Sequence, residues 1–247
     1  MTSIALISDI HANALALDAV LADIRARGCD RILCLGDLVG YGPRPGEVIA
    51  CIRTENIETV MGNYDEAVGF TLPACGCHID NPRQKALSRH SLHWAIAHTT
   101  PQERAFLRSL PETLSVEVEG ISFCLTHATP DSITEYLYQA DAARMAEIIA
   151  LITQDVYVYG HTHLPFHAVL GGKHILNAGS VGRPKDFDTR AGYMLAQVHG
   201  QRLRAEVVRV PYDVAQVVRE MAAQGIDEAF GRFLLDGGEG ETQSRNP

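Results

Sequence analysis

The sequence has no long apolar run and carries fewer basic than acidic side chains. Although 46% of its 247 residues are hydrophobic, no stretch approaches the ~18 consecutive apolar residues of a membrane-spanning helix, so we expect no membrane span. Lys and Arg total 21 against 30 Asp and Glu, which gives a formal net charge of -9. This balance argues against a protein that holds extended nucleic acid on a basic surface. The same balance is compatible with a small anionic substrate that binds at a local cation.

An export signal is also missing, and cysteine is scarce. The opening MTSIALISD has no basic residue and ends in an aspartate, which does not fit a signal peptide. We therefore expect a cytoplasmic protein whose six cysteines are reduced. The cluster Cys75-Gly76-Cys77-His78 could suggest zinc, but no second Cys/His pair follows at a fitting spacing. A turn of small residues is the favoured interpretation.

The first third of the chain alternates between strand and helix patterns. Ser3 to Ser8 forms a short apolar run, as in a strand buried on both faces. Apolar residues then recur at helical spacing from Leu15 to Arg27, and Gly28 follows as a natural stop. A second buried strand is expected over Arg31–Leu35, a helix over Pro45–Arg53 and a third strand over Ile57–Met61. This alternation predicts an α/β fold with a parallel sheet.

The middle of the chain predicts a small helical lid, at about residues 71–111. Thr71 to Asn81 is a loop rich in Pro, Gly and Cys, and Pro82 to His98 has helical character. A second helix should begin at Pro101, because proline suits the first helical position, and should end near Leu110 before another proline.

The remaining chain is rich in predicted strands. Besides a hairpin over residues 114–126 and a helix over 140–151, we expect strands at 156–159, 166–170, 173–176, 192–198 and 202–210. A final helix should begin after Asp213, which suits the N-cap position. We expect one domain over residues 1–235 and, because residues 236–247 have no apolar side chain, a disordered tail.

Five polar groups interrupt the apolar strands where each strand should end. They are Asp9-Ile10-His11, Gly36-Asp37, Gly62-Asn63-Tyr64-Asp65, His127 and Gly160-His161-Thr162-His163. Each group alone is common by chance, but all five at the carboxyl ends of strands, where ligands gather in parallel sheets, are harder to dismiss. Residues two apart on an extended chain face the same side, so each Asp-x-His or His-x-His pair can aim two donors at one point. Oxygen and nitrogen donors without thiolate suit divalent Mn, Fe, Zn, Co or Ni.

The order and spacing of these groups from Ser3 to about Val210 resemble the calcineurin-like metallophosphoesterase superfamily. Gly40-Tyr41-Gly42-Pro43 and Asn177-Ala178-Gly179-Ser180-Val181-Gly182 further resemble its small bacterial members, among them YfcE-like phosphodiesterases and dinucleoside-polyphosphate hydrolases. The resemblance implies a four-layer α/β/β/α sandwich with the site at the edge between two sheets. It also implies an enzyme, a hydrolase of phosphoric esters that uses metal-activated water.

The resemblance further implies a site for two divalent metal ions, manganese among the candidates. Asp9, His11 and His163 would hold one ion, Asn63, His127 and His161 the other, and Asp37 would bridge both. Two dications would outweigh two aspartates and attract phosphate, while a shared water would attack the phosphorus.

One position departs from the family pattern. Many members have a histidine after the asparagine of Gly-Asn-His-Asp/Glu, where it is thought to protonate the leaving group, but this chain has Tyr64. An ordinary tyrosine, with a pKa near ~10, is a poor proton donor at neutral pH. Good leaving groups are therefore expected, as in aryl esters or nucleotide anhydrides. Asp65, which would support a histidine here, keeps an open role beside Asn63 and Tyr64 as catalytic candidates.

Further residues have two interpretations each. Asn13 could contact a substrate phosphate or cap the following helix, and Arg183 could bind a phosphate or lie in solvent. Tyr41 could stack on a base or simply pack. Among the lid histidines at positions 90, 93 and 98, the first two share a helix face and are expected to be solvated, unless one reaches the site and replaces the missing acid.

Three functions from different classes are compatible with these residues. The first is a dinuclear phosphoesterase acting on phosphodiesters or nucleotide polyphosphates, with a small phosphorylated substrate that could be a nucleotide. The second is a phosphomonoesterase or protein phosphatase with the same site. The third is a non-catalytic scaffold, which would predict lost ligands, whereas every ligand position is filled. The sequence leaves the metal, the physiological substrate and the oligomeric state open.

Overall fold

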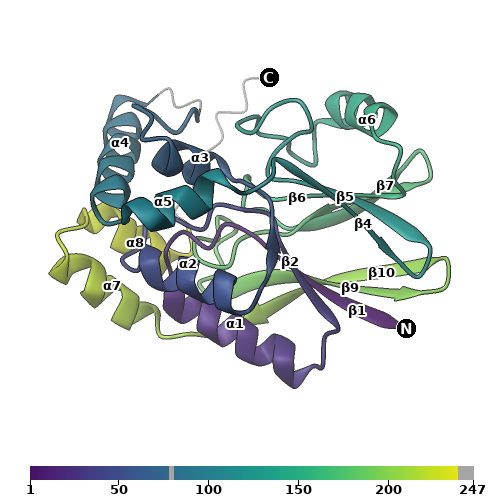
Figure 1. The fold of residues 1–247 in the computed structure, drawn as a ribbon, viewed down its shortest axis with the longest axis horizontal. Helices are drawn as coiled ribbons and strands as arrows, with labels where there is room; N and C mark the ends of the chain where they lie inside the picture. The colour runs from purple at the N-terminus through teal and green to yellow at the C-terminus, as the bar shows by residue number, and fades with distance from the viewer. Residues whose placement is uncertain (78–80, 239–247) are drawn as a thin grey trace.

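Two five-stranded sheets organise the molecule (Figure 1). The structure is a computed structural model that describes residues 1–77 and 81–238. The first sheet runs in the order β10 (Arg202–Val210), β9 (Ala191–His199), β1 (Thr2–Ile7), β2 (Arg31–Cys34) and β3 (Glu58–Thr59). The second runs β4 (Thr113–Val118), β5 (Ile121–Thr126), β6 (Val156–Tyr159), β8 (Lys173–Asn177) and β7 (Phe166–Leu170).

Strand direction within the two sheets follows the connections. β1, β2 and β3 are parallel, while β9 and β10 run antiparallel beside β1. β5, β6 and β8 are likewise parallel, with β4 and β7 antiparallel at the edges. The parallel strands at the centre of each sheet bring the carboxyl ends of β1, β2, β5 and β6 toward one end of the sandwich. Ligand sites of parallel sheets lie at such an end.

Helices cover the outer faces of both sheets and the end of the sandwich (Figure 1). They are α1 (Ala14–Ala26), α2 (Pro45–Thr54), α3 (Asn63–Gly69), α4 (Pro82–Ala97), α5 (Pro101–Arg108), α6 (Ala142–Leu151), α7 (Val214–Ala223) and α8 (Glu228–Asp236). None of the helices within residues 1–77 and 81–238 has the length and apolar character needed to cross a lipid bilayer.

Alternating side chains of the strands separate three apolar layers. In β1, Ala5 and Ile7 pack with α1, while Ile4 and Leu6 join the layer between the sheets. In β6, the valines face the first sheet, and Tyr157 and Tyr159 pack with Met145 and Ile148 of α6. Because successive strand residues point to opposite faces, both sheets are buried on both sides. The predicted four-layer α/β/β/α fold is confirmed.

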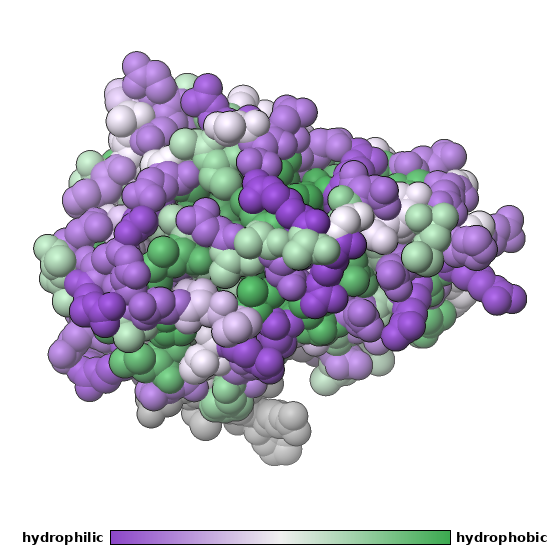
Figure 2. All heavy atoms as spheres, turned by 90° about the horizontal axis from the view of Figure 1, so that it is seen from below, coloured by the Kyte–Doolittle hydropathy of each residue, from purple (hydrophilic) through white to green (hydrophobic). Residues whose placement is uncertain are grey.

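The space-filling view shows how hydrophilic and hydrophobic residues are distributed over one face. Figure 2 views the molecule from below, so that the side with α1 and α7 faces the reader. Hydrophilic side chains interrupt the apolar ones over this face. Such a mixture is usual for the surface of a globular protein.

Three local predictions differ from the structure. The third strand is only Glu58–Thr59, because the Met61 N–H already donates to the carbonyl of Pro111 (2.7 Å) and the chain leaves the sheet. The short helix α3 starts inside the Gly-Asn-Tyr-Asp motif and is too brief to show a periodic pattern. The helix after Asp213 is not the last one, since α8 follows, with Gly231 weakening its helical signal.

The helices expected in the lid are present and pack on the body of the protein. Leu92 and Ala95 of α4 and Leu107 of α5 belong to the same apolar cluster as α1 and α2. The indole N–H of Trp94 donates to the carbonyl of Gln224 after α7 (3.2 Å). Of the predicted tail, Asp236 ends α8, and residues 239–247 lie outside the described residues.

Glu119, in the turn between β4 and β5, joins the two sheets and predicts a pH-dependent contribution to stability. Its carboxylate accepts from the Thr2 hydroxyl (2.7 Å) and from the Gly200 N–H (3.0 Å), which lower its pKa from 4.5 to about 2. The stabilisation is therefore complete above about pH 4.5 and is lost as the pH falls toward 2. We expect Glu119→Gln to lower the melting temperature by about 1–3 °C at pH 7.

Thermal melts between pH 2 and pH 7 measure this effect. The difference from wild type should shrink as the pH falls below about 4.5. Glu117→Gln, a substitution on an exposed position of β4, is the matched control and should change little. A Glu119→Gln difference that persists unchanged down to pH 2 would contradict the assignment.

Candidate metal centre

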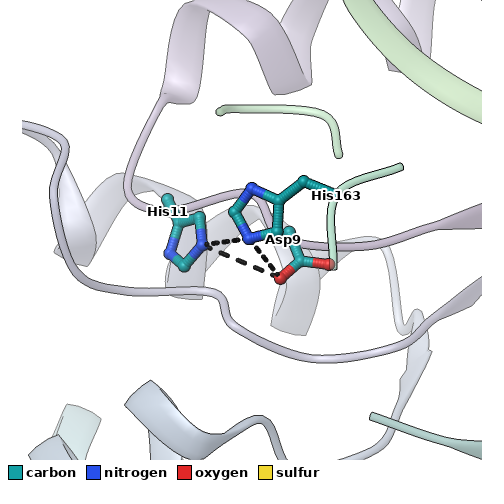
Figure 3. Close-up of side chains that lie close together, drawn as sticks. All are labelled: Asp9, His11 and His163. Atoms are coloured by element: carbon teal, nitrogen blue, oxygen red, sulfur yellow. Dashed lines mark hydrogen bonds and ion pairs between the residues drawn. The ribbon is translucent and has the colours of Figure 1, made fainter. Parts of the chain in front are cut away.

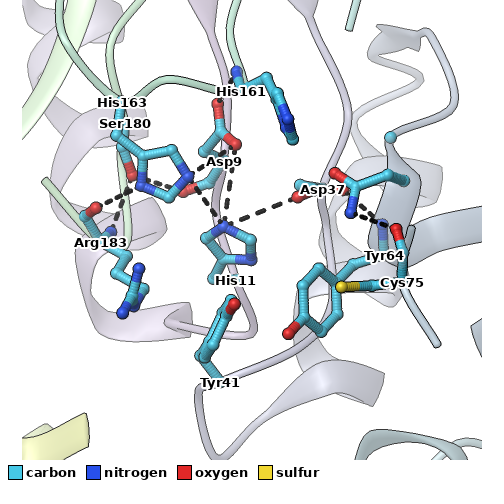
Figure 4. A network of polar contacts seen from close by, with 12 residues as sticks. Asp9, His11, Asp37, Tyr41, Tyr64, Cys75, His161, His163, Ser180 and Arg183 are labelled. Carbon is cyan, nitrogen blue, oxygen red and sulfur yellow. Dashed lines mark hydrogen bonds and ion pairs between the residues drawn. The ribbon is translucent and has the colours of Figure 1, made fainter. Parts of the chain in front are cut away.

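Loops that follow five strands bring seven polar side chains close together, and Figure 4 labels five of them, Asp9, His11, Asp37, His161 and His163. All of them are at most 3% exposed. Asp9 and His11 follow β1, Asp37 follows β2, Asn63 follows β3, His127 follows β5, and His161 and His163 follow β6. The gathering of the predicted ligands at the carboxyl ends of the parallel strands is therefore seen in the structure.

A first group consists of Asp9, His11 and His163 (Figure 3). Asp9 Oδ1 lies 3.1 Å from His163 Nε2 and 3.7 Å from His11 Nε2, and the two imidazole nitrogens are 3.3 Å apart. The three atoms therefore surround a single point.

A second group consists of Asp37, His127 and His161, with Asn63 beside them. His127 Nε2 lies 3.1 Å from both His161 Nδ1 and Asn63 Oδ1. Asp37 Oδ2 lies 3.6 Å from His127 Nε2 and 3.7 Å from His11 Nε2 of the first group. This oxygen lies between the two groups, as a bridging carboxylate must.

The prediction that the two histidines of the Gly-His-Thr-His motif aim at one point is wrong. His161 and His163 do not aim at the same point, because His161 belongs to the second group and His163 to the first. Both have φ of 60° and are not in an extended strand, so the rule for residues two apart does not apply.

Each of the four imidazoles is oriented by a hydrogen bond to a backbone carbonyl. His11 Nδ1 donates to Val39 (3.1 Å) and His127 Nδ1 to Leu35 (2.7 Å). In the same way His163 Nδ1 donates to Arg183 (2.5 Å), and His161 Nε2 donates to Thr134 (3.2 Å). A carbonyl cannot donate, so the proton must sit on these nitrogens and the inward nitrogens carry lone pairs.

The inward atoms are therefore acceptors that face one another without a proton between them. Burial lowers the pKa of all four imidazoles, and it lowers those of His11 and His161 furthest, so the rings are neutral. Asp9 Oδ1 is a buried oxygen without a hydrogen-bond partner among the described residues. Converging lone pairs and an orphaned carboxylate oxygen fit a divalent cation in each group, because a cation satisfies them together.

The backbone at these residues is strained in the way often seen at functional sites. Asp9, His11, Asp37, His161 and His163 all have φ between 49° and 60°, a region that side chains with a Cβ disfavour. Such strain persists only where the surroundings hold it, and it clusters at ligand sites.

Glycines of the motifs allow the loops to approach one another. A Cβ on Gly62 would lie 2.2 Å from both the backbone nitrogen and Oδ1 of Asp37. A Cβ on Gly160 would lie 2.0 Å from Ser8 Oγ and 2.6 Å from Asp9 Oδ2. Both glycines are therefore needed for close packing beside a carboxylate.

Tyr64 and Asp65 serve the site through the backbone. The Tyr64 N–H donates to Asp37 Oδ1 (2.8 Å) and leaves Oδ2 free to bridge. Its phenol is buried and lies 3.2 Å from Ser88 Oγ, and burial raises its pKa well above the usual value. Asp65 accepts from the N–H groups of Leu38 (2.8 Å) and Gly62 (3.0 Å), and burial raises its pKa to about 7.

Asn13 caps a helix, which favours the structural one of its two interpretations. Its Oδ1 accepts from the Ala16 N–H at the start of α1 (3.2 Å). Its Nδ2 lies within hydrogen-bond distance of the Gly182 carbonyl (3.0 Å) and the Tyr212 hydroxyl (3.2 Å). Both ends of the side chain are therefore engaged inside the protein.

Arg183 lies beside the first group. Its guanidinium carbon lies 4.3 Å from the ring centre of Tyr41 and 3.7 Å from that of Phe233 in α8. Tyr41 in turn packs edge-on against His11, with ring centres 4.9 Å apart. A cation between two aromatic faces is held in place while its N–H edges stay able to bind an anion.

The lid histidines stay away from the site. The side chains at positions 90, 93 and 98 are exposed, and His98 stacks on Trp94 with ring centres 3.8 Å apart. The predicted turn lies close to the second group instead, since Asn63 Nδ2 donates to the Cys75 carbonyl (2.9 Å). His78, the last residue of the zinc alternative, lies outside the described residues.

Sequence reasoning missed the residues that orient the ligands. Tyr136 stacks on His161 with ring centres 4.3 Å apart, and Thr134 supplies a carbonyl. Every residue has a backbone carbonyl, whatever its side chain. No sequence signal therefore marks Leu35, Val39 or Thr134 for this role.

Comparisons with known proteins agree with this geometry. A family model described as the calcineurin-like phosphoesterase superfamily domain matches residues 2–201. The chain belongs to this superfamily. An uncharacterised protein of Methanocaldococcus jannaschii is 31% identical over 257 positions, which cover 95% of this chain and 98% of that protein.

Two further relatives carry more specific names. The crystal structure of a metallophosphoesterase from Sphaerobacter thermophilus is 30% identical, covers 96% of this chain and 99% of its own, and has a TM-score of 0.77. A protein of Escherichia coli named phosphodiesterase YfcE is 28% identical over 188 residues, which cover 72% of this chain and 78% of that protein. The superfamily and these relatives support a hydrolase.

Gly62→Ala should weaken metal binding, because the added methyl group collides with Asp37, the residue common to both groups. We expect a loss of metal affinity of about 10–100-fold. Metal content after gel filtration, with circular dichroism as a check of folding, measures it. Gly46→Ala in α2 adds the same methyl group at a position without positive φ, where the nearest atoms belong to the end of the Glu103 side chain, and serves as the control. Equal metal content in Gly62→Ala and wild type would contradict the prediction.

Proposed function

We propose that the protein is a dinuclear metal-dependent phosphoesterase that hydrolyses phosphodiesters or nucleotide polyphosphates. The observation that carries this proposal is the pair of converging lone-pair groups on the two sides of Asp37 Oδ2. Asp9, His11 and His163 would hold one ion and Asn63, His127 and His161 the other. When bound, the two ions lower the pKa of a shared water and neutralise charge on the phosphoryl oxygens.

Charge favours a phosphate at this point of an acidic protein. The ligand set carries two carboxylates and otherwise neutral side chains, so two divalent ions leave an excess of positive charge. Arg183, with its faces held between Tyr41 and Phe233, adds a cation beside the first group and is our candidate substrate contact. Asn13 contributes less in this proposal, because its donors and acceptor are engaged.

The surroundings of Tyr64 favour substrates with good leaving groups. Its hydroxyl is buried beside Ser88 and has a raised pKa, and the lid histidines are exposed. A leaving group of low basicity, such as an aryl oxide or a nucleotide phosphate, departs without a strong general acid. The E. coli relative named as a phosphodiesterase supports a diester substrate over a monoester.

The other functional classes remain as outcomes of the test. A phosphomonoesterase would use the same ligands but needs protonation of a more basic leaving group. A non-catalytic scaffold has no need of ligands, whereas all seven positions are filled and grouped. The same proposal includes a small substrate whose choice is set by the lid at about residues 71–111, and manganese as one candidate metal. It also includes a cytoplasmic location, in which the free cysteines stay reduced.

Metal removal should abolish hydrolysis, and Asp37→Ala should have a similar effect. Loss of the bridging oxygen affects both groups at once, so we expect activity to fall by more than about a hundredfold. Hydrolysis of bis(p-nitrophenyl) phosphate and p-nitrophenyl phosphate is measured together with metal content, which should be two ions in wild type and fewer in the variant. Asp18→Ala, at an exposed site in α1, is the control. Full activity after confirmed metal removal would refute the proposal.

Tyr64→Phe should stay within about tenfold of wild type, because a general acid typically contributes 10²–10⁴-fold and this hydroxyl faces Ser88. The rates for a series of aryl diesters with increasingly basic leaving groups measure the effect. A loss of a hundredfold or more that is confined to poor leaving groups would identify Tyr64 as the acid.

A further inference from the structure

The loop between β5 and α6 contacts His161 through Thr134 and Tyr136, which are separated by one residue. The carbonyl of Thr134 accepts from His161 Nε2 (3.2 Å), and the ring of Tyr136 stacks on the imidazole at an interplanar angle of 27°. These contacts fix both the tautomer and the plane of His161. Its Nδ1 is thereby directed toward His127 and the second group.

Glu135, the residue between them, is held by Arg144 of α6. Arg144 Nε lies 2.8 Å from Glu135 Oε1, and Nη2 lies 2.8 Å from Oε2, so the pair is bidentate. The same guanidinium binds both carboxylate oxygens of Asp131 (2.7 Å each) and Oε2 of Glu147 (3.0 Å). A planar fork with five N–H donors can hold three carboxylates in this way, and an ammonium group cannot.

In the middle of the loop, Arg144 binds both Asp131 and Glu135, and the Thr129 hydroxyl donates to Asp131 Oδ1 (3.0 Å) and Glu135 Oε2 (2.9 Å). Tyr157 and Tyr159 of β6 fix the ends of the loop, since their hydroxyls donate to the carbonyls of Ala128 (2.6 Å) and Leu137 (2.9 Å). Between these anchors, Asp131 and Glu135 lie close together, and Arg144 lowers the pKa of both. Without Arg144 the two carboxylates lose their counter-charge and repel one another, so Glu135 is held less firmly between Thr134 and Tyr136.

We propose that Arg144 is a positioning residue that fixes His161 through Glu135 and thereby sets the affinity of the second group for its ion. The inference rests on the proposed function only in that the second group holds a metal. Hydrogen bonds to a ligating histidine orient its ring and raise its basicity, so their loss weakens metal binding. The first group has no contact with this loop in the hydrogen bonds described above and should keep its affinity.

Calorimetric titration of the metal-free full chain with Mn²⁺ tests the proposal. Arg144→Met should lower the affinity of the second group for Mn²⁺ about 10–100-fold and leave the affinity of the first group unchanged. Arg144→Lys keeps the positive charge but not the forked guanidinium. Its second group should therefore have an affinity between those of wild type and Arg144→Met. Arg204→Met, which removes an exposed arginine paired with Glu206 on β10, is the matched control and should bind both ions as wild type does. Glu135→Gln should weaken the same ion as Arg144→Met.

A second measurement needs no metal. In the metal-free wild type, the nitrogen chemical shifts of His161 should show a proton on Nε2, and Arg144→Met should show a mixture of tautomers. Unchanged metal affinities and an unchanged tautomer in Arg144→Met would overturn the proposal, as would an equal weakening of both ions. If Arg144→Met does not fold, Glu135→Gln decides between the same outcomes. A wild type that binds fewer than two ions would refute the dinuclear function, while the tautomer would still test the role of Arg144.

Discussion

Hydrogen bonds from imidazole N–H groups to backbone carbonyls are the constraint on which the site depends. His11 of the first group donates to Val39, and His127 of the second donates to Leu35. Asp37 lies midway between Leu35 and Val39 in the sequence, and its Oδ2 is 3.7 Å from His11 Nε2 and 3.6 Å from His127 Nε2. Residues 35–39, directly after β2, therefore set the distance between the first and second groups. Any shift of this segment moves one candidate ligand of each group together with Asp37, the proposed bridging residue.

This arrangement requires costly features that a packed core alone would not keep. Two aspartates and four imidazoles are buried together, and neutral rings face one another through their lone pairs. Five ligands have positive φ, and Asp9 Oδ1 lacks a hydrogen-bond donor among the residues described. Buried polar groups without partners oppose folding. The surrounding sandwich supplies the stability that holds these groups in place, and the cations of the proposed function would remove the conflict.

The fold and the grouping of the candidate ligands could be predicted from the sequence because their signals are local and repeated. Apolar runs such as Ser3–Ser8 mark the strands, and each polar motif follows one of them. The division of His161 and His163 between the two groups could not be read from spacing, since it depends on positive φ values. Likewise, the carbonyls that orient the imidazoles have no side-chain signature, and Arg144 lies 17 residues from His161 in sequence, on another element.

The elements that border the ligands also decide how far a relative's activity can be transferred to this chain. The family match ends at residue 201, and β10, α7 and α8 follow it. Phe233 of α8 packs on Arg183, and Phe230 packs on Tyr41, whose ring touches His11. The ion pair between Arg44 and Glu220 ties α7 to the loop that carries Tyr41. The candidate metal ligands thus belong to the shared domain, while the C-terminal helices build one wall beside them. Because specificity resides in such walls rather than in the fold, substrate choice must be argued from Arg183, Tyr41 and Phe233 of this chain.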